Sequence, residues 1–210
     1  MGRLFVTFEG IDRSGKTTQI KLFNKYLKDN NYNFSIYREP GGTSVSEKIR
    51  DILLDKDNYV SPYTELLLYI ASRRQLLDEK ILTDLNNKIV ICDRYIDSTI
   101  VYQGVLRNIS RERILKLHEL VDINLMPDLT FLLDISAEES IRRMRDSDKV
   151  DRMEDISYEF IQNLRNGFLK LANIENKRFF IIDGTLSVEE INKLIIDKFE
   201  QKIKERTDDE

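Results

Sequence analysis

The sequence contains a single cysteine among 210 residues, which excludes an internal disulfide. Cys92 lies in the apolar run KIVIC (residues 88–92), so we interpret it as a small buried side chain. No apolar run reaches the roughly 18 residues that a membrane span needs. The beginning of the chain, MGRLFVTFEG, also lacks the charged-then-apolar layout of a signal peptide. These absences predict a cytoplasmic protein that does not bind a membrane.

The chain also lacks an excess of basic charge. The formal net charge is -4 and the isoelectric point is near 5.3. A protein that binds nucleic acid through its phosphates normally carries a basic face, so this balance excludes nucleic-acid binding and requires that any phosphate site be local. The one histidine, His118, is bordered by Leu117 and Leu120 in a helical run, and we expect it to be structural rather than catalytic.

Apolar runs and helical segments alternate along the chain. Five short runs predict buried strands, at residues 4–8, 33–37, 88–92, 129–135 and 178–183. Helical spacing is found at residues 17–27, 63–85, 111–121, 158–171 and 188–202, and capping boxes at Ser136/Glu139 and Ser187/Glu190 mark two helix starts. This alternation predicts an α/β fold with a five-stranded parallel sheet flanked by helices on both faces.

One domain is expected, because the chain has no linker and no internal repeat. It would span residues 1–203, and the charged residues 204–210 (KERTDDE) would fray. Residues 142–154 (RRMRDSDKVDRME) are dense in charge and lack an apolar stripe. We therefore expect a mobile loop there rather than a part of the core.

A phosphate-binding motif, G-x-x-x-x-G-K-T, runs from Gly10 to Thr17 between a predicted strand and a predicted helix. In such a P-loop the backbone N–H groups cradle phosphates, Lys16 reaches the terminal phosphates and the Thr17 hydroxyl binds Mg²⁺. The motif predicts binding of a nucleoside triphosphate, most simply ATP. The predicted ATP-binding residues are Gly10, Ile11, Asp12, Arg13, Ser14, Gly15, Lys16, Thr17 and Thr18.

Three further segments place arginines near this loop. They are REPGGT (residues 38–43), ASRR (residues 71–74) and DRYIDSTIVYQG (residues 93–104). Because the ends of parallel strands open at one edge of the sheet, we expect Arg38, Arg73 and Arg94 to share one cleft facing the triphosphate.

These motifs, in this order, resemble those of the thymidylate kinase family over nearly the whole chain. The resemblance implies a P-loop nucleoside monophosphate kinase-like fold, a homodimer, and ATP- and Mg²⁺-dependent phosphorylation of dTMP to dTDP for deoxythymidine triphosphate synthesis. By the same resemblance, Arg38 and Arg94 hold the monophosphate, Tyr69 stacks on thymine and Arg73 bonds its carbonyl. Ser98 or Thr99 and Gln103 read the edge of the base, and Tyr102 excludes a ribose. Asp12 is expected to touch the acceptor sugar, and the resemblance implies that residues 142–154 form a lid over ATP.

Phosphoryl transfer to a monophosphate needs no general base, because the acceptor oxygens are already ionised at neutral pH. Catalysis then depends on positioning and charge neutralisation. The expected catalytic residues are Arg13, Lys16, Asp93, Arg94 and Arg152, with Thr17 and Asp93 holding Mg²⁺. Arg13 in the loop is favoured over Arg152 in the charged segment for bridging the transferred group.

Two alternatives stay open at this point. In a deoxynucleoside kinase, Glu39 would deprotonate a sugar hydroxyl, although three acceptor-side arginines exceed what a neutral nucleoside needs. A nucleotide-driven switch would bind a partner and need no second arginine cleft. The sequence also leaves open whether dUMP or a modified deoxynucleotide is accepted.

Overall fold

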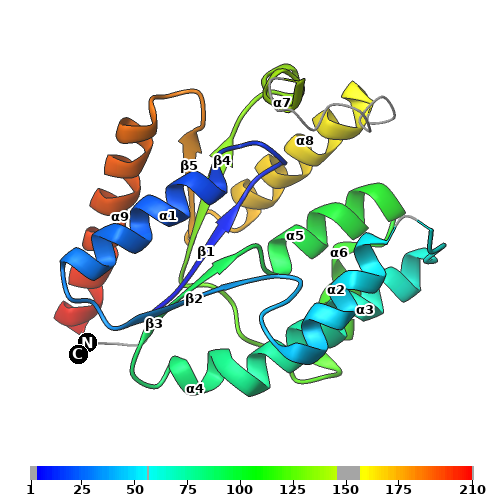
Figure 1. Cartoon of the computed structure of the whole chain (residues 1–210), viewed down its shortest axis with the longest axis horizontal. Coiled ribbons are helices and arrows are strands. Elements are labelled where there is room, and N and C mark those ends of the chain that lie inside the picture. Colours follow the sequence, from blue (N-terminus) through cyan, green and yellow to red (C-terminus); the bar gives the residue numbers. More distant parts are fainter. Residues whose placement is uncertain (1–3, 56, 146–156, 210) are drawn as a thin grey trace.

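A five-stranded parallel sheet forms the centre of the protein (Figure 1). The computed structural model describes residues 4–55, 57–145 and 157–209. The strands are β1 (Leu4–Glu9), β2 (Phe34–Arg38), β3 (Ile89–Asp93), β4 (Leu129–Asp134) and β5 (Phe179–Asp183), in the order β2-β3-β1-β4-β5. All four pairings are parallel. The α/β prediction and all five predicted strands are confirmed, each within one residue at either end.

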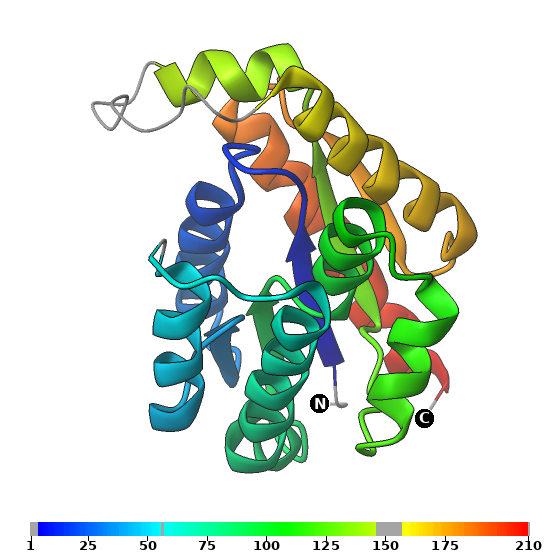
Figure 2. The same ribbon diagram turned by 90° about the vertical axis from the view of Figure 1, so that its right-hand side faces the viewer.

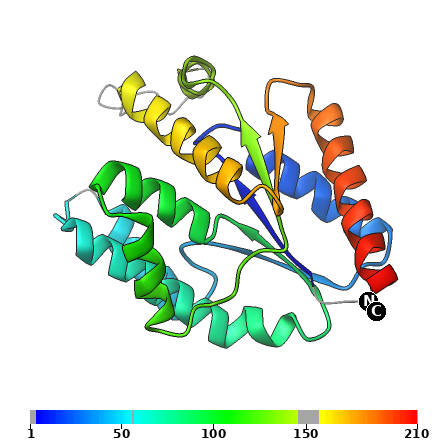
Figure 3. The same cartoon turned by 180° about the vertical axis from the view of Figure 1, so that it is seen from behind.

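Helices cover both faces of the sheet, as Figures 1 and 3 show from opposite sides. Side chains alternate between the faces along a strand. In β1, Phe5 packs in one apolar cluster, with residues of α3 (Pro62–Leu76), α5 (Ile96–Val101) and α8 (Tyr158–Ile174). Its neighbours Val6 and Phe8 belong to a second cluster, which α1 (Lys16–Asp29) and α9 (Val188–Asp209) cover through residues such as Phe23 and Phe199. The sheet is therefore buried between two helical layers.

The remaining helices are α2 (Ser44–Leu54), α4 (Leu82–Asp84), α6 (Arg111–Glu119) and α7 (Ala137–Arg145), with two widened π-helical turns, η1 (Leu77–Ile81) and η2 (Tyr102–Leu106). The sequence patterns did not predict α2 or α5, and of α7 they predicted only the start, at Ser136. The segment predicted as one helix over residues 63–85 is α3, η1 and α4 in succession, because the i→i+5 turn of η1 interrupts the α-helical ladder.

The capping predictions are confirmed to different degrees. The Ser187/Glu190 box is reciprocal: the Ser187 N–H donates to Glu190 (3.0 Å) and the Glu190 N–H donates to Ser187 Oγ (3.2 Å). At the other box the Glu139 N–H donates to Ser136 Oγ (3.1 Å), but the Glu139 carboxylate accepts from Arg142 and Arg143 instead. The charged pair partners outcompete the backbone for this carboxylate.

Two boundary predictions need correction. The tail does not fray over residues 204–209, since α9 continues to Asp209. An ion pair between Arg206 and Asp128 and a hydrogen bond from Gln201 to Glu205 (2.9 Å) hold this last part of the helix. The expected mobile segment is helical at residues 142–145, the last turn of α7, and its remainder, including Lys149 and Arg152, lies outside the described residues.

The carboxyl ends of the strands gather the segments that carry the motifs. Figure 2 shows the turn after β1 next to α7 at one end of the sheet, and the Ser140 hydroxyl of α7 donates to the Asp12 carbonyl across this junction (2.8 Å). Among the described residues, no helix is long and apolar enough to span a bilayer. In a parallel sheet, ligands bind at the carboxyl ends of the strands, which here include those of β1, β2 and β3.

Candidate functional site

The turn between β1 and α1 has the backbone of an anion-binding loop. Gly10 and Gly15 have φ values of 139° and 101°, a region that favours glycine. A Cβ on Gly10 would lie 2.6 Å from the Leu133 carbonyl oxygen, so a side chain there would force the turn after β1 away from the end of β4. The loop then enters α1 at Lys16, where backbone N–H groups and the helix dipole favour a bound anion.

Lys16 lies folded into this loop. Its Nζ donates to the carbonyls of Gly10 and Ile11 (2.9 Å each), and the residue is 7% exposed. Burial lowers the pKa of Lys16 to about 7, and the nearby positive charge of Arg94 acts in the same direction. A polyanion in the loop would supply the missing counter-charge and favour the protonated ammonium.

A cavity of about 560 Å³, here named the P-loop cavity, opens over this turn. It is lined by Asp12, Arg13, Ser14, Gly15, Lys16, Thr17, Thr18, Gln19, Asp93, Arg94, Arg143, Gly184, Leu186, Val188 and Ile191. Thr17 and Asp93 thus face one space and offer hydroxyl and carboxylate oxygens, the hard donors that Mg²⁺ prefers. Their chemistry fits a magnesium ion with water completing its coordination. No group of three or more His, Cys, Asp or Glu side chains suited to a metal occurs in the described parts of the chain.

Two arginines border the P-loop cavity from different elements. Arg13, at φ 63° in the loop, has an exposed side chain. Arg143 of α7 donates to the backbone carbonyls of Arg13 (3.2 Å) and Gly184 (2.7 Å), and its Nε donates to Glu139 (2.6 Å). Arg143 therefore ties α7 to the backbone of the loop.

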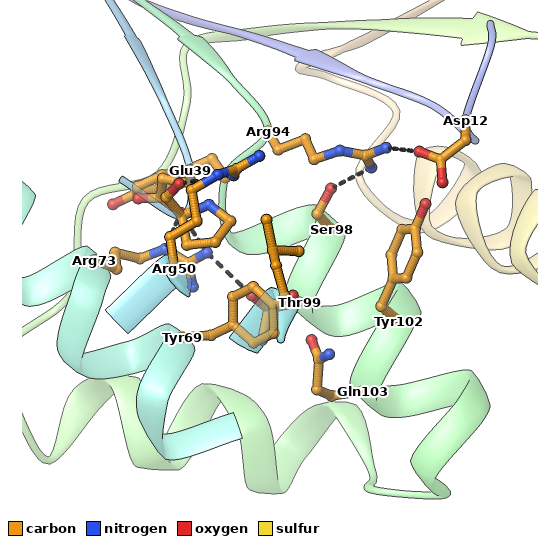
Figure 4. Close-up of a pocket in the computed structure, with 13 residues that line it drawn as sticks. Asp12, Glu39, Arg50, Tyr69, Arg73, Arg94, Ser98, Thr99, Tyr102 and Gln103 are labelled. Atoms are coloured by element: carbon orange, nitrogen blue, oxygen red, sulfur yellow. Dashed lines mark hydrogen bonds and ion pairs between the residues drawn. The ribbon is translucent and has the colours of Figure 1, made fainter. Parts of the chain in front are cut away.

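A second cavity, of about 300 Å³ and here named the arginine cavity, adjoins the first (Figure 4). It is lined by Asp12, Glu39, Pro40, Arg50, Leu54, Tyr69, Arg73, Arg94, Tyr95, Ser98, Thr99, Tyr102 and Gln103. Asp12 and Arg94 line both cavities, so a ligand in one lies next to a ligand in the other.

Arg94 lies at this junction in a left-handed backbone conformation, with φ 67°. Its guanidinium donates to Asp12 Oδ1 (2.5 Å), Ser98 Oγ (3.1 Å) and the Gly10 carbonyl (3.2 Å). The same group stacks 5.2 Å from the centre of the Tyr102 ring. Figure 4 shows it reaching across the cavity from β3 toward Asp12. These contacts hold a permanent positive charge between the two cavities.

Glu9 supports this arrangement from within the core. Its fully buried carboxylate accepts from the backbone N–H groups of Tyr95 (2.8 Å) and Ser98 (3.3 Å) and from the Ser98 hydroxyl (2.6 Å). Burial and the neighbouring Asp97 raise the pKa of Glu9 to about 7, although Arg94 opposes the shift. The end of β1 thereby caps the first turn of α5 and sets the position of Ser98 beside Arg94.

Arg73 lies at the inner wall of the arginine cavity and is 1% exposed. Its Nε and Nη2 both donate to Glu39 Oε2 (2.8 and 2.5 Å), and Nη2 also donates to Thr99 Oγ1 (3.0 Å). Nη1 lies 2.6 Å from His118 Nε2. Burial raises the pKa of Glu39 despite the opposite effect of Arg73, while the ion pair raises the pKa of Arg73 itself. The guanidinium is therefore a fixed, charged donor.

Gln103 and Tyr102 come from the widened turn η2. The Gln103 Nε2 donates to Glu65 Oε1 (2.7 Å), and because an ionised carboxylate only accepts, this contact assigns the amide orientation and leaves the Gln103 carbonyl oxygen available. The Tyr102 hydroxyl is buried with no hydrogen-bond partner in the described chain, and burial raises its pKa to about 12. Both side chains line the arginine cavity (Figure 4).

The comparisons with known proteins agree with this geometry. The family model described as thymidylate kinase matches residues 8–195. The chain belongs to the thymidylate kinase family. It is 47% identical over 194 residues to a thymidylate kinase of Thermoanaerobacter pseudethanolicus, covering 92% of this chain and 95% of that protein. It is 45% identical over 201 residues to one from Caldanaerobacter subterraneus subsp. tengcongensis, covering 95% and 96%. A crystal structure of thymidylate kinase from Ehrlichia chaffeensis has a TM-score of 0.76 at 36% identity and covers 95% of this chain and 100% of that one.

Within this thymidylate kinase family member, most residues singled out from the sequence line the two cavities. In the arginine cavity these are Asp12, Tyr69, Arg73, Arg94, Ser98, Thr99, Tyr102 and Gln103. In the P-loop cavity they are Asp12, Arg13, Ser14, Gly15, Lys16, Thr17, Thr18, Asp93 and Arg94. Gly10 and Ile11 contribute the carbonyls that hold Lys16, and Arg152 lies outside the described residues. The predicted proximity of Arg73 and Arg94 is confirmed.

Arg38 is the exception. It does not line the arginine cavity; it pairs with Glu47 (2.8 Å), and its side chain is 47% exposed. Glu47, in the first turn of α2, also accepts from the Gly42 N–H (2.7 Å), and Arg38 Nη1 donates to the Pro40 carbonyl (2.9 Å), so these contacts hold Arg38 at this turn. Arg50, three residues further along α2, lines the cavity instead and donates to the Pro40 carbonyl (3.0 Å).

The sequence did hold a signal for Arg50. Thr43 accepts from the Ser46 N–H (3.1 Å) and so caps α2, and Glu47 follows in the first turn. A cap residue followed by an acidic first turn marks a helix start. Recognising α2 would have placed Arg50 on a helix that begins at the predicted cleft.

Proposed function

We propose that this protein transfers the terminal phosphoryl group of ATP to the phosphate of dTMP, giving ADP and dTDP. The observation that carries the proposal is the pair of adjoining cavities, which share Asp12 and Arg94 and hold the P-loop on one side and further arginines on the other. Relatives named thymidylate kinase, at up to 47% identity over most of the chain, support the choice of substrate.

On the donor side, the P-loop residues 10–18 bind the phosphates of ATP through backbone N–H groups and Lys16. Thr17 and Asp93 would hold Mg²⁺. When bound, the ion would supply positive charge that neutralises the phosphates of the donor. The lowered pKa of Lys16 is consistent with a side chain that awaits an anion. Arg13 and, beyond the described residues, Arg152 are the groups we propose to neutralise the transferred phosphoryl group, with Arg13 favoured.

On the acceptor side, Arg94 and Arg50 hold the monophosphate. Arg94 already lies between the cavities, where the attacking oxygen must stand. Positive charge there reduces the repulsion between two anionic partners and aligns them for in-line transfer. The acceptor oxygen is ionised at neutral pH, so no side chain has to remove a proton. We keep Arg38 only as an indirect support of the turn that leads to α2.

The base site matches one edge of thymine. Arg73 offers an N–H donor and Gln103 a carbonyl acceptor, and thymine presents a carbonyl beside an N–H. Tyr69 provides an aromatic surface for stacking. Ser98, Thr99, Tyr102 and Asp12 line the same cavity. We propose that Ser98 or Thr99 reads the edge of the base, that Tyr102 excludes a ribose 2′-hydroxyl and that Asp12 touches the sugar.

The geometry disfavours a deoxynucleoside kinase. In that mechanism Glu39 would need to take a proton from a sugar hydroxyl, but its Oε2 accepts two hydrogen bonds from Arg73 and its Oε1, which has no partner in the described chain, is buried. A neutral nucleoside would also lack a phosphate for Arg50 and Arg94 to bind. A homodimer stays a prediction of the family resemblance, and a cytoplasmic location stays a prediction from the sequence.

The test is ADP formation from ATP and Mg²⁺ with dTMP, dUMP, thymidine and the ribose analogue of dTMP as separate acceptors. We expect kcat/KM for dTMP to exceed that for the ribose analogue and for thymidine by about a hundredfold or more. The 2′-hydroxyl of the ribose analogue would meet Tyr102, and thymidine has no phosphate for Arg94 and Arg50 to bind. Preference for thymidine would reject the proposal and make Glu39 the base. Absence of turnover with every acceptor would favour a nucleotide-dependent switch.

A further inference from the structure

His118 occupies an unusual position for the single histidine of the chain. It lies on α6, is 1% exposed and does not line either cavity. Its ring contacts Arg73 across 45 residues of sequence, through Nε2 and Nη1 at 2.6 Å. On the other side of the ring, Nδ1 lies 2.8 Å from the Ile114 carbonyl oxygen. A purely apolar core position would not require either contact.

The chemistry of the partners assigns the protonation of the ring. Arg73 can only donate, so His118 Nε2 must accept and carries no proton. The Ile114 carbonyl can only accept, so Nδ1 carries the proton. Burial and the charge of Arg73 lower the pKa of His118 to about 4, which keeps this neutral form throughout the neutral range. The imidazole is therefore a permanent acceptor aimed at Arg73.

The hydrogen bonds of Arg73 show how this acceptor limits the orientation of the guanidinium. A guanidinium has five N–H groups. Two donate to Glu39, one to Thr99 and one to His118. The fifth belongs to Nη1, the nitrogen that His118 engages. The planar guanidinium is held from Nε and Nη2 by Glu39 and from Nη1 by His118, so the last N–H has a single direction left.

We propose that His118 is a positioning residue for base recognition: it holds Arg73 so that one Nη1 N–H faces the base carbonyl in the arginine cavity. The proposal rests on the proposed function, because it presumes that the protein recognises its acceptor nucleotide through a carbonyl group of the base at this place. His118 acts through Arg73 and touches neither substrate nor phosphate. It thereby contributes to discrimination between a base that carries a carbonyl there and one that carries an amino group.

Removal of the acceptor has a distinct kinetic signature. Without His118 an Nη1 N–H is left buried and unpaired, and Arg73 gains freedom to tilt away from the base. The base lies away from the reacting phosphates, so the lost interaction is made equally in the ground state and the transition state. KM for dTMP then rises while kcat at saturation and KM for ATP change little.

The experiment compares three variants of the full chain with the wild type. His118→Leu removes the acceptor, His118→Gln keeps an acceptor oxygen of similar reach, and Ile114→Val is the control, a buried substitution one turn away on α6. Steady-state constants are measured with dTMP and with dCMP, which presents an amino group where dTMP has its carbonyl. For His118→Leu we expect KM for dTMP and the dTMP-to-dCMP preference each to worsen about tenfold, with kcat within about twofold. His118→Gln should stay within about threefold of the wild type, and Ile114→Val should match it.

The outcomes separate this inference from the proposed function. A wild type that fails to use dTMP would reject the proposed function. A wild type that prefers dTMP, together with a His118→Leu variant of unchanged KM and unchanged preference, would overturn the role of His118 alone. A fall in kcat with both nucleotides would equally overturn it, because that is the behaviour of a general structural defect.

A measurement on the wild type keeps the inference testable if His118→Leu does not fold. With one histidine in the chain, ¹⁵N spectroscopy reports a single imidazole. We expect protonated Nδ1 and unprotonated Nε2 at pH 7, and a shift of the Nε2 resonance when dTMP binds but not when ATP binds. A proton on Nε2, or no response to dTMP, would overturn the proposal.

Discussion

The buried state of His118 makes the stability of this protein depend on pH in a calculable way. The pKa of His118 falls from 6.5 to about 4 on folding, because the ring is buried beside the positive charge of Arg73. Between pH 6.5 and pH 4 the unfolded chain therefore binds a proton at this histidine that the folded chain does not bind. The unfolded state is favoured as the pH decreases, and the contribution of neutral His118 to stability is complete above pH 6.5 and lost toward pH 4.

The magnitude follows from the two pKa values. At pH 5 the unfolded histidine is protonated in about 97% of molecules and the folded one in about 9%. The free energy of unfolding then decreases by about 2 kcal/mol between pH 7.5 and pH 5 on account of this one group. Because His118 is only 1% exposed, solvent does not screen its interaction with Arg73.

Urea denaturation of the wild type and of His118→Gln at pH 7.5 and pH 5 measures this contribution. Other groups titrate in the same range, including Glu9 and Lys16, whose pKa values are each about 7, but they are present in both proteins and cancel in the difference. We expect the wild type to lose about 2 kcal/mol more than the variant over this interval. Equal losses in the two proteins would refute the assignment of a buried, neutral His118 beside Arg73.

Three further predictions concern charge. Arg50→Ala should raise KM for dTMP about tenfold to a hundredfold through the loss of a charged hydrogen bond to phosphate, whereas Arg38→Ala should change it about threefold or less; the reverse order would restore Arg38 to the acceptor site. Arg13→Ala should lower kcat by about 10³-fold or more with a much smaller change in KM for ATP, measured by ADP release, and an unchanged kcat would remove Arg13 from catalysis. Asp97→Asn should destabilise the fold by about 3 kcal/mol, because Asp97 is fully buried and accepts two hydrogen bonds of 2.7 Å from Arg178. Thermal and urea unfolding at pH 7.5 measure this loss of stability, and a loss below about 1 kcal/mol would contradict the prediction.

The parts of the fold that were predictable are those encoded in neighbouring residues. The strands of the sheet are short apolar runs, and the P-loop is a contiguous motif between a strand and a helix, so both could be read from local pattern. The Ser187/Glu190 box marked the start of α9 for the same reason. The end of α9 was not predictable, because it depends on the contact of Arg206 with Asp128, 78 residues away.

The candidate site divides in the same way. Lys16 and Thr17 follow the turn after β1, Asp93 ends β3 and Arg94 comes next. Parallel strands bring their ends to one edge, so the sequence pattern and the fold class together predicted their proximity. Arg50 escaped prediction because the sequence patterns did not predict α2. In the structure Arg38 pairs with Glu47, and Arg50 lines the cavity.

By itself the sequence determined the sheet, the phosphate-binding loop and the set of polar residues available at its edge, since alternation, turn chemistry and capping act between residues close in the chain. Only the tertiary structure decided how those polar residues are used. His118 looked like a helix residue beside leucines, and its contact with Arg73 depends on how α6 is rotated and packed against α3. Such contacts are set by long-range packing, because a buried donor must find its acceptor wherever the fold places one.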